Sequence, residues 1–216
     1  MSYINKLEIG KLLNRTELMP VVKDQILSTE LSENDLFSLE LYSLAKGEQI
    51  SSHTLLAATL YIVLNGEIDI SNNKVKELNY FYSPKSSTAK LLALEDSQIF
   101  IYTFKNEKAL KNIISNKSTP LASQINLVKM AVSSKILIQE EEVSLTLFSL
   151  AVDEGLNTHK AGGDAMLLPL EGEINLKIAD QPFTVNNSNI IILPAGIPHS
   201  LTATQPYKML LTVVTK

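Results

Sequence analysis

The chain has 216 residues, of which 45% are hydrophobic and 19% charged, and its net charge is −4 at neutral pH. This composition is typical of a globular protein, and the mildly acidic balance without a basic block argues against nucleic acid or an anionic membrane as a partner. The sequence contains no cysteine, which excludes disulfides and suits a reducing compartment. With neither an N-terminal signal-peptide core nor an apolar run long enough to span a bilayer, we expect a cytoplasmic protein.

The first half of the chain reads as a series of short strands separated by turn residues. The segments are rich in β-branched, aromatic and other apolar side chains, which favour pleated, half-buried structure. They are LFSLELYSL (36–44), TLYIVL (59–64), EIDI (67–70), KELNYFYS (76–83), KLLAL (90–94) and QIFIYTF (98–104).

Two segments near the middle of the chain have a helical spacing of apolar residues. Asn106–Ser115 places Ala109, Leu110, Ile113 and Ile114 on one face, and Leu121–Ser134 has a similar stripe. Pro120 lies between them and cannot continue a helix. The sequence therefore predicts an N-terminal domain over 1–105, a short helical connector over 106–120 and a C-terminal domain over 121–216.

The second half returns to short strands. They are VSLTLFSLAV (143–152), DAMLLPL (164–170), EINLKIA (173–179), FTV (183–185), NIIIL (189–193) and KMLLTVV (208–214). Many short strands at even spacing are typical of a sandwich or barrel. The predicted fold class is therefore all-β.

The two halves are copies of one β-unit. LYSLAKGEQISSH, ending at His53, matches LFSLAVDEGLNTH, ending at His159, 106 residues further on. The segment NYFYSP, ending at Pro84, matches NIIILP, ending at Pro194, 110 residues on. A repeat of about half the chain predicts two domains of roughly 100 residues each. Only the second copy has two histidines, because His199 has no counterpart in the first.

The second half resembles the cupin superfamily. The resemblance lies in THKAGGDAM, LEGE and PAGIPHSL, where His159 and Gly172 fit the first family motif, and Pro194, Gly196 and His199 fit the second. It implies two jelly-roll β-barrels in tandem, a bicupin, and places the functional site inside a barrel. In the first half, only His53 survives among the family's four metal-ligand positions, so the first barrel is expected to be metal-free.

The second barrel departs from the family's metal-site pattern. Alanine stands at the positions of the second metal histidine, the carboxylate and the closing asparagine, which are 161, 165 and 203. His159 and His199 are then the only candidate metal ligands from the family's set. Asp164 could supply a carboxylate, but on an alternating strand it is one residue out of phase. A catalytic zinc needs about three protein ligands, and non-haem iron prefers two histidines and a carboxylate.

Two functions are compatible with these residues. The leading interpretation is a non-catalytic or sensory small-molecule-binding protein without a cofactor, whose pocket is lined by Ala161, Ala165 and Leu201 with His159 and His199 at its polar end. The alternative is a metal-dependent enzyme of the dioxygenase or isomerase type, with Zn, Fe, Mn or Ni held by the two histidines. The pocket could also be filled by neighbouring side chains. We expect a monomer with an internal pseudo-dimer, or a homodimer.

Overall fold

The computed structural model describes residues 2–106 and 110–215, and it forms two compact units. The N-terminal unit is Thr16–Pro120, and the C-terminal unit combines residues 2–15 with residues 121–215. In the described residues, regular structure consists of strands and one short 3-10 helix, η2 (Ala122–Gln124). The all-β prediction is confirmed. No helix in this part of the chain is long and apolar enough to cross a membrane.

The N-terminal unit contains a six-stranded sheet, ordered β11-β8-β5-β10-β3-β2, and a four-stranded sheet, ordered β4-β9-β6-β7. The strands are β2 (Ile26–Glu33), β3 (Phe37–Leu44), β4 (Gln49–Thr54), β5 (Ala58–Asn65), β6 (Glu67–Ile70), β7 (Asn73–Lys76), β8 (Asn79–Ser83), β9 (Thr88–Ala93), β10 (Ser97–Phe104) and β11 (Thr119–Pro120).

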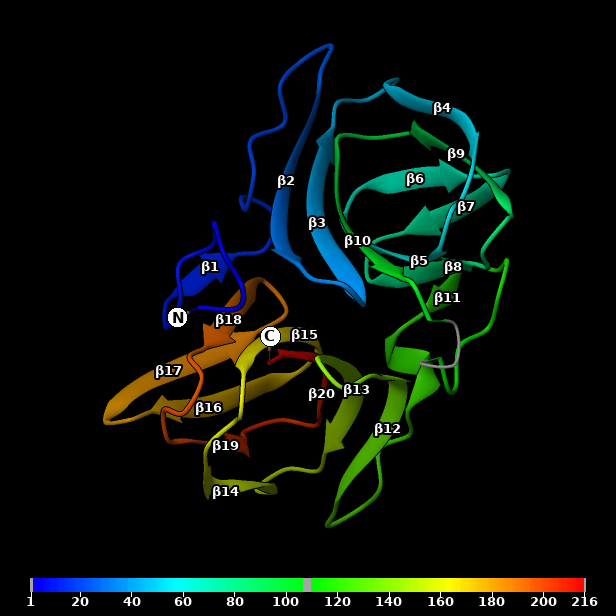
Figure 1. Ribbon diagram of the computed structural model, residues 1–216. Coiled ribbons are helices and arrows are strands. Elements are labelled where there is room, and N and C mark those ends of the chain that lie inside the picture. Colours follow the sequence, from blue (N-terminus) through cyan, green and yellow to red (C-terminus); the bar gives the residue numbers. More distant parts are fainter. Residues whose placement is uncertain (1, 107–109, 216) are drawn as a thin grey trace. The chain divides into compact units, whose positions relative to one another are not determined.

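The C-terminal unit repeats this plan (Figure 1), with one sheet ordered β1-β18-β15-β20-β13-β12 and another ordered β14-β19-β16-β17. The strands are β1 (Leu12–Asn14), β12 (Val132–Gln139), β13 (Val143–Leu150), β14 (Gly155–His159), β15 (Asp164–Glu171), β16 (Glu173–Ile178), β17 (Gln181–Asn186), β18 (Asn189–Leu193), β19 (His199–Ala203) and β20 (Tyr207–Val214). Neighbouring strands in these sheets pair antiparallel.

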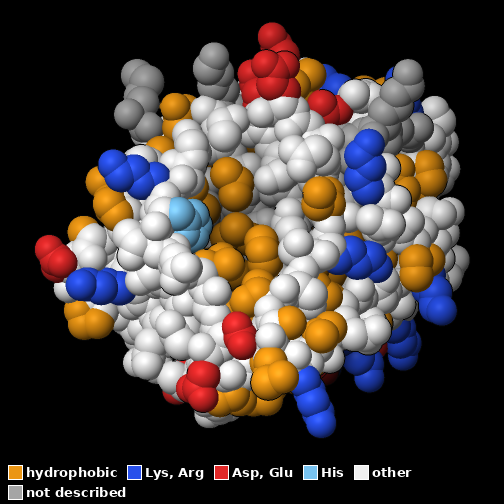
Figure 2. Space-filling view, turned by 90° about the horizontal axis from the view of Figure 1, so that it is seen from below, with side chains coloured by type: hydrophobic (Ala, Val, Ile, Leu, Met, Phe, Trp, Pro, Cys, Tyr) orange, Lys and Arg blue, Asp and Glu red, His pale blue; other side chains and the backbone are white. Residues whose placement is uncertain are grey.

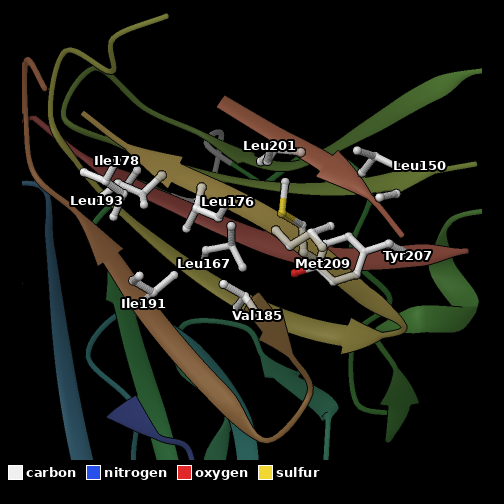
Figure 3. Packing of buried hydrophobic residues seen from close by; sticks show 13 residues of the cluster. Leu150, Leu167, Leu176, Ile178, Val185, Ile191, Leu193, Leu201, Tyr207 and Met209 are labelled. Atoms are coloured by element: carbon white, nitrogen blue, oxygen red, sulfur yellow. The ribbon is translucent and has the colours of Figure 1, made fainter. Parts of the chain in front are cut away.

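The core of the C-terminal unit is formed by the facing sides of its two sheets (Figure 3). Leu167 and Met209 come from the larger sheet, and Leu176 and Leu201 come from the smaller one. Leu176 and Leu201 alternate with polar residues along β16 and β19, as expected because successive side chains of a strand point to opposite faces. Each fully buried side chain of this kind stabilises the fold by about 1.5–3 kcal/mol. The strands form two separate sheets around the core and not one closed hydrogen-bonded barrel.

The predicted helical connector is wrong wherever the structure describes it; residues 107–109 lie outside the described part. From Ile114 on, the described backbone bonds to β8. The Asn116 N–H donates to the Tyr82 carbonyl over 2.9 Å, and the Ile114 N–H donates to the Tyr80 hydroxyl. Asn116 has φ of 55°, which no right-handed helix contains. Tertiary hydrogen bonds therefore overrode the helical spacing.

The second helical prediction, over Leu121–Ser134, is also wrong. Only Ala122–Gln124 forms a single 3-10 turn, and β12 begins at Val132. Leu121 and Ile125 are buried, but Leu127, Val128 and Met130 are exposed, so the apolar residues of this segment do not form one continuous buried face. A helix of this length gains most of its stability from burying such a face.

The N-terminal segment belongs to the C-terminal unit, whereas the sequence placed it with the first domain. β1 pairs with β18, with Leu13 opposite Ile190. The Arg15 N–H donates to the Ser188 carbonyl over 2.9 Å, and the Gly10 N–H donates to the Ile192 carbonyl over 2.8 Å. Figure 1 shows this segment beside β18. The β18 edge would otherwise present unpaired backbone groups, which explains why an additional strand is added there.

Candidate functional site

His159 and His199 lie directly opposite each other on the paired strands β14 and β19. Their ring centroids are 4.4 Å apart and the ring planes make an angle of 64°. His199 shares the inward face of β19 with Leu201 and is 5% exposed, whereas His159 is exposed at the end of β14. The structure therefore brings the two predicted histidines together, with one ring buried and one accessible.

A β-bulge and a glycine position this pair. The register starts with Gly155 opposite Thr202 and shifts between Leu156 and His159. Without the shift, Thr158 would stand opposite His199. A Cβ on Gly155 would lie 2.1 Å from the Leu201 carbonyl oxygen, so only glycine permits this close approach of β14 to β19.

Hydrogen bonds define the tautomer of both rings. Nδ1 of His159 lies 2.7 Å from the Asn157 carbonyl oxygen, and Nδ1 of His199 lies 3.1 Å from the Ile197 carbonyl oxygen. Because a carbonyl only accepts, each Nδ1 carries the proton and donates it. In the neutral rings, each Nε2 therefore keeps a lone pair for a ligand. The pair is thus a double hydrogen-bond acceptor.

His199 is held neutral by its surroundings. Burial lowers its pKa, and the neighbouring His159 lowers it further, while the hydrogen bond to Ile197 acts in the opposite direction. Burial dominates because it penalises the charged form of the ring. At neutral pH His199 accepts hydrogen bonds through Nε2.

The predicted apolar lining lies in and against the core. Ala165 and Leu201 are 1% and 3% exposed and belong to the core cluster, and Ala161 is partly buried against it. Phe148, Leu211 and Val213 are likewise only partly buried against this cluster. Figure 2 shows hydrophobic side chains gathered in a hollow with a histidine at its edge. Of the predicted lining, Ala161 is therefore partly accessible to solvent, whereas Ala165 and Leu201 are buried.

Two further hollows were not anticipated from the sequence. One, of about 360 Å³, is lined by His199 together with Thr158, Lys177 and Asp180. Another, of about 380 Å³, shares Lys177 and Ser200 with it. Lys177 and Ser200 alternate with core residues on β16 and β19 and so face outward, a period-two signal that the sequence does contain. Two of the hydrogen-bonding side chains beside His199, Lys177 and Ser200, are therefore outward-facing strand residues, whereas Asp180 lies in the turn between β16 and β17.

Asp164 has a different role from the one considered in the sequence. Its side chain is buried, at 2% exposed, and accepts four hydrogen bonds. Oδ2 accepts from the Ser2 hydroxyl over 2.8 Å and from the N–H groups of Tyr3 and Ile4 over 2.6 and 3.0 Å. Oδ1 accepts from the Ala195 N–H over 3.0 Å. Burial alone would raise the pKa of Asp164, but these hydrogen bonds outweigh it and hold the pKa below its usual range.

The residues of the site do not fit the metal centre that the cupin resemblance implies. No group of three or more His, Cys, Asp or Glu side chains suited to a metal occurs among the described residues. Asp164 is not grouped with the histidines, and its carboxylate is engaged by four hydrogen bonds from residues 2–4 and Ala195. Two imidazoles alone fall short of the ligand sets preferred by zinc and non-haem iron.

The N-terminal unit differs at the corresponding positions. Ala89 replaces His199 opposite His53, although His53 Nδ1 also bonds to a carbonyl, that of Ser51, over 3.0 Å. Glu40 and Thr59 stand where the C-terminal unit has Thr146 and Ala165. The pKa of Glu40 is raised by burial and by the charge of Glu33. At these positions the N-terminal copy thus has a glutamate and a threonine, whereas the C-terminal copy has a threonine and an alanine together with the histidine pair.

The fold is shared with solved cupin structures. A cupin 2 conserved barrel domain protein from Leptotrichia buccalis is 25% identical and superposes with a TM-score of 0.83, covering 99% of this chain and 100% of its own. Protein Ylba from E. coli is 17% identical with a TM-score of 0.59 over 94% of this chain and 89% of its own. A salicylate 1,2-dioxygenase from Pseudaminobacter salicylatoxidans is 10% identical with a TM-score of 0.56, covering 83% of this chain and 71% of its own.

No protein-family model and no curated protein sequence matches the chain. The structural likeness, the repeat and the two motifs together place the chain in the cupin superfamily, with two cupin-like halves. The more distant structures share the fold alone, and a fold hosts many functions. The function therefore has to be argued from the site.

Proposed function

We propose that the protein binds a small, mostly apolar molecule carrying a hydrogen-bond donor, without catalysing its conversion, at the histidine pair of the C-terminal unit. The observation that carries this proposal is the pair itself, with both Nδ1 atoms committed to backbone carbonyls. A ligand hydroxyl or N–H is the complement of the two Nε2 lone pairs. The protein is proposed to act in the cytoplasm.

The surrounding side chains support an apolar body for this ligand. Ala161, Phe148 and Val213 are partly buried apolar residues packed against the core. Ala165 and Leu201 would form the floor beneath them. Binding sites for small molecules are generally apolar surfaces with a few placed polar groups, as here.

The test uses 4-methylphenol as a probe and toluene as its analogue without a donor. Titrations are followed by NMR of the imidazole ring nitrogens. We expect 4-methylphenol to shift the signals of His159 and His199 and to bind roughly fivefold or more tightly than toluene, since one hydrogen bond contributes about 1 kcal/mol. His199→Ala should abolish this preference for the phenol.

His53→Ala is the matched control, because His53 makes the same Nδ1 contact but faces an alanine. It should leave binding unchanged. Equal losses from His53→Ala and His199→Ala would show that the site is assigned to the wrong unit. Equal affinity for the two probes would remove the role given to the histidine pair.

A further inference from the structure

The carboxylate of Asp164 joins three segments of the C-terminal unit that are far apart in sequence. It stands at the start of β15, next to Ala165 of the proposed floor. It accepts hydrogen bonds from residues 2–4 and from Ala195 in the turn between β18 and β19. Because the side chain is buried, water cannot easily replace these donors.

The turn that Asp164 holds leads directly to the buried histidine. Ala195 is followed by Gly196 and Ile197, whose carbonyl accepts the Nδ1 proton of His199. The Gly196 N–H also donates to the Ala161 carbonyl over 2.9 Å, which ties the turn to the segment after His159. Displacement of the turn would therefore move the carbonyl that orients His199.

The N-terminal residues reach Asp164 along β18. Gly10 and β1 bond to this strand, and Arg15 bonds to Ser188 just before it. The strand continues into the same turn. Ile4 is 1% exposed and donates to Asp164 through its N–H. The segment is thus attached both along the strand and at its end.

The repeat offers an internal comparison. In the N-terminal unit, Ala58 stands at the position of Asp164, and Ala89 stands at the position of His199. The unit that has the histidine pair is therefore also the unit that has the aspartate.

We propose that residues 2–4 are a positioning element of the ligand site, acting through Asp164 on the turn that orients His199. The expected effect on ligand affinity rests on the proposed function, but the effect of residues 2–4 on the His199 ring can be measured without a ligand. Displacing residues 2–4 from Asp164 loosens the turn, changes the environment of the His199 ring and weakens binding.

The experiment is a double-mutant cycle on the full chain. One change is Asp164→Asn, which replaces an acceptor oxygen by a donor of the same shape, and the other is deletion of residues 2–4. Ser2→Ala is a milder variant, in case the deletion does not fold; it removes the Ser2 hydroxyl, which contacts both Asp164 and the Ile4 carbonyl. Asp153→Asn, at an exposed aspartate of the same unit, is the matched control. Ring-nitrogen and Ala195 amide NMR signals are recorded first, followed by titration with 4-methylphenol.

We expect Asp164→Asn and the deletion each to shift the His199 and Ala195 signals and to weaken 4-methylphenol binding about tenfold. The double variant should be no weaker than either single one, because both changes break the same contact. Asp153→Asn should match the wild type. Additive losses, or folded variants with wild-type His199 signals, would overturn the proposal. If the wild type fails to bind 4-methylphenol while the His199 and Ala195 signals still respond as expected, the proposed function fails and the positioning role stands.

Discussion

The imidazoles of His159 and His199 meet edge to face, with centroids 4.4 Å apart, and both donate their Nδ1 protons to carbonyls two residues earlier in the chain. The pair therefore presents lone pairs and not protons. No described carboxylate accompanies it in a metal-binding group. Two Nε2 acceptors beside apolar side chains, with no third metal ligand among the described residues, are the basis of the proposed binding of a ligand with a hydrogen-bond donor.

We predict that protein purified without a histidine tag or chelator carries clearly less than one divalent metal per chain. The two histidines are too few ligands to fix Zn, Fe, Mn or Ni firmly. Elemental analysis by mass spectrometry measures this. Stoichiometric metal that disappears in His159→Ala would instead favour the metal-dependent enzyme.

The stability of the fold should decrease as the pH falls below the ordinary histidine value. The pKa of His199 is lowered from 6.5 by burial and by His159, so the unfolded chain binds the proton more readily than the folded one. The contribution of His199 is then fully present above pH 6.5 and is lost as the pH falls through its folded pKa. Urea unfolding at a series of pH values measures the effect. A His199→Gln variant should flatten this part of the profile, whereas His53→Gln should not.

Gly155→Ala should destabilise the C-terminal unit by about 1–3 kcal/mol, the usual effect of forcing an atom into a packed contact. The new Cβ would meet the Leu201 carbonyl oxygen at 2.1 Å. Gly162→Ala is the control, because nothing lies within 4 Å of its Cβ position. Chemical denaturation compares the two. Equal stability of both variants would show that β14 can move away from β19 without loss.

Asp164→Ala should lower the free energy of unfolding by at least about 3 kcal/mol, since each hydrogen bond to a charged group contributes about 1.5–3 kcal/mol and the buried Ile4 N–H also loses its acceptor. For a chain of this size, that corresponds to a melting temperature lower by roughly 6–12 °C. Calorimetry measures the change. The exposed control Asp153→Asn should melt close to the wild type, and a similarly small change in Asp164→Ala would contradict the structural role of this carboxylate.

Residues 121–216 expressed alone should homodimerise or aggregate, while the full chain should be no larger than a dimer. The fragment lacks β1, which leaves the β18 edge unpaired, and it lacks the donors of Asp164. Uncovered apolar surface would add to the association. Light scattering decides between these states. A well-behaved monomeric fragment would show that neither the N-terminal segment nor the other unit is needed.

Much of the fold could be predicted from local patterns. The 106-residue offset between His53 and His159 revealed the duplicated unit, and the β-branched and apolar composition of short segments such as 143–152 predicted strands. Both patterns depend on side-chain type and spacing alone. The two helical predictions were wrong because a periodic apolar pattern indicates only which side chains a helix would bury if it formed. The pattern does not show whether the fold offers an apolar surface against which that helix face could pack. The side chains of Leu127, Val128 and Met130 remain exposed.

The candidate site was predictable in part. The motifs predicted that His159 and His199 belong to one site, and the structure brings their rings together on two paired strands. The β-bulge that puts His159 opposite His199 in place of Thr158 could not be predicted, since it depends on how β14 and β19 meet.

The sequence by itself determined that the chain is a duplicated all-β protein with its histidine pair in the second copy. Repeats, alternation and residue identity are local properties, so the linear order already contains them. Only the tertiary structure decided the roles of Asp164 and residues 2–15. A carboxylate next to a site and a carboxylate turned away from it look alike in sequence. Which donors reach it depends on a backbone path that places the N-terminal segment beside β18 and brings Tyr3 to Asp164, 161 residues further along the chain.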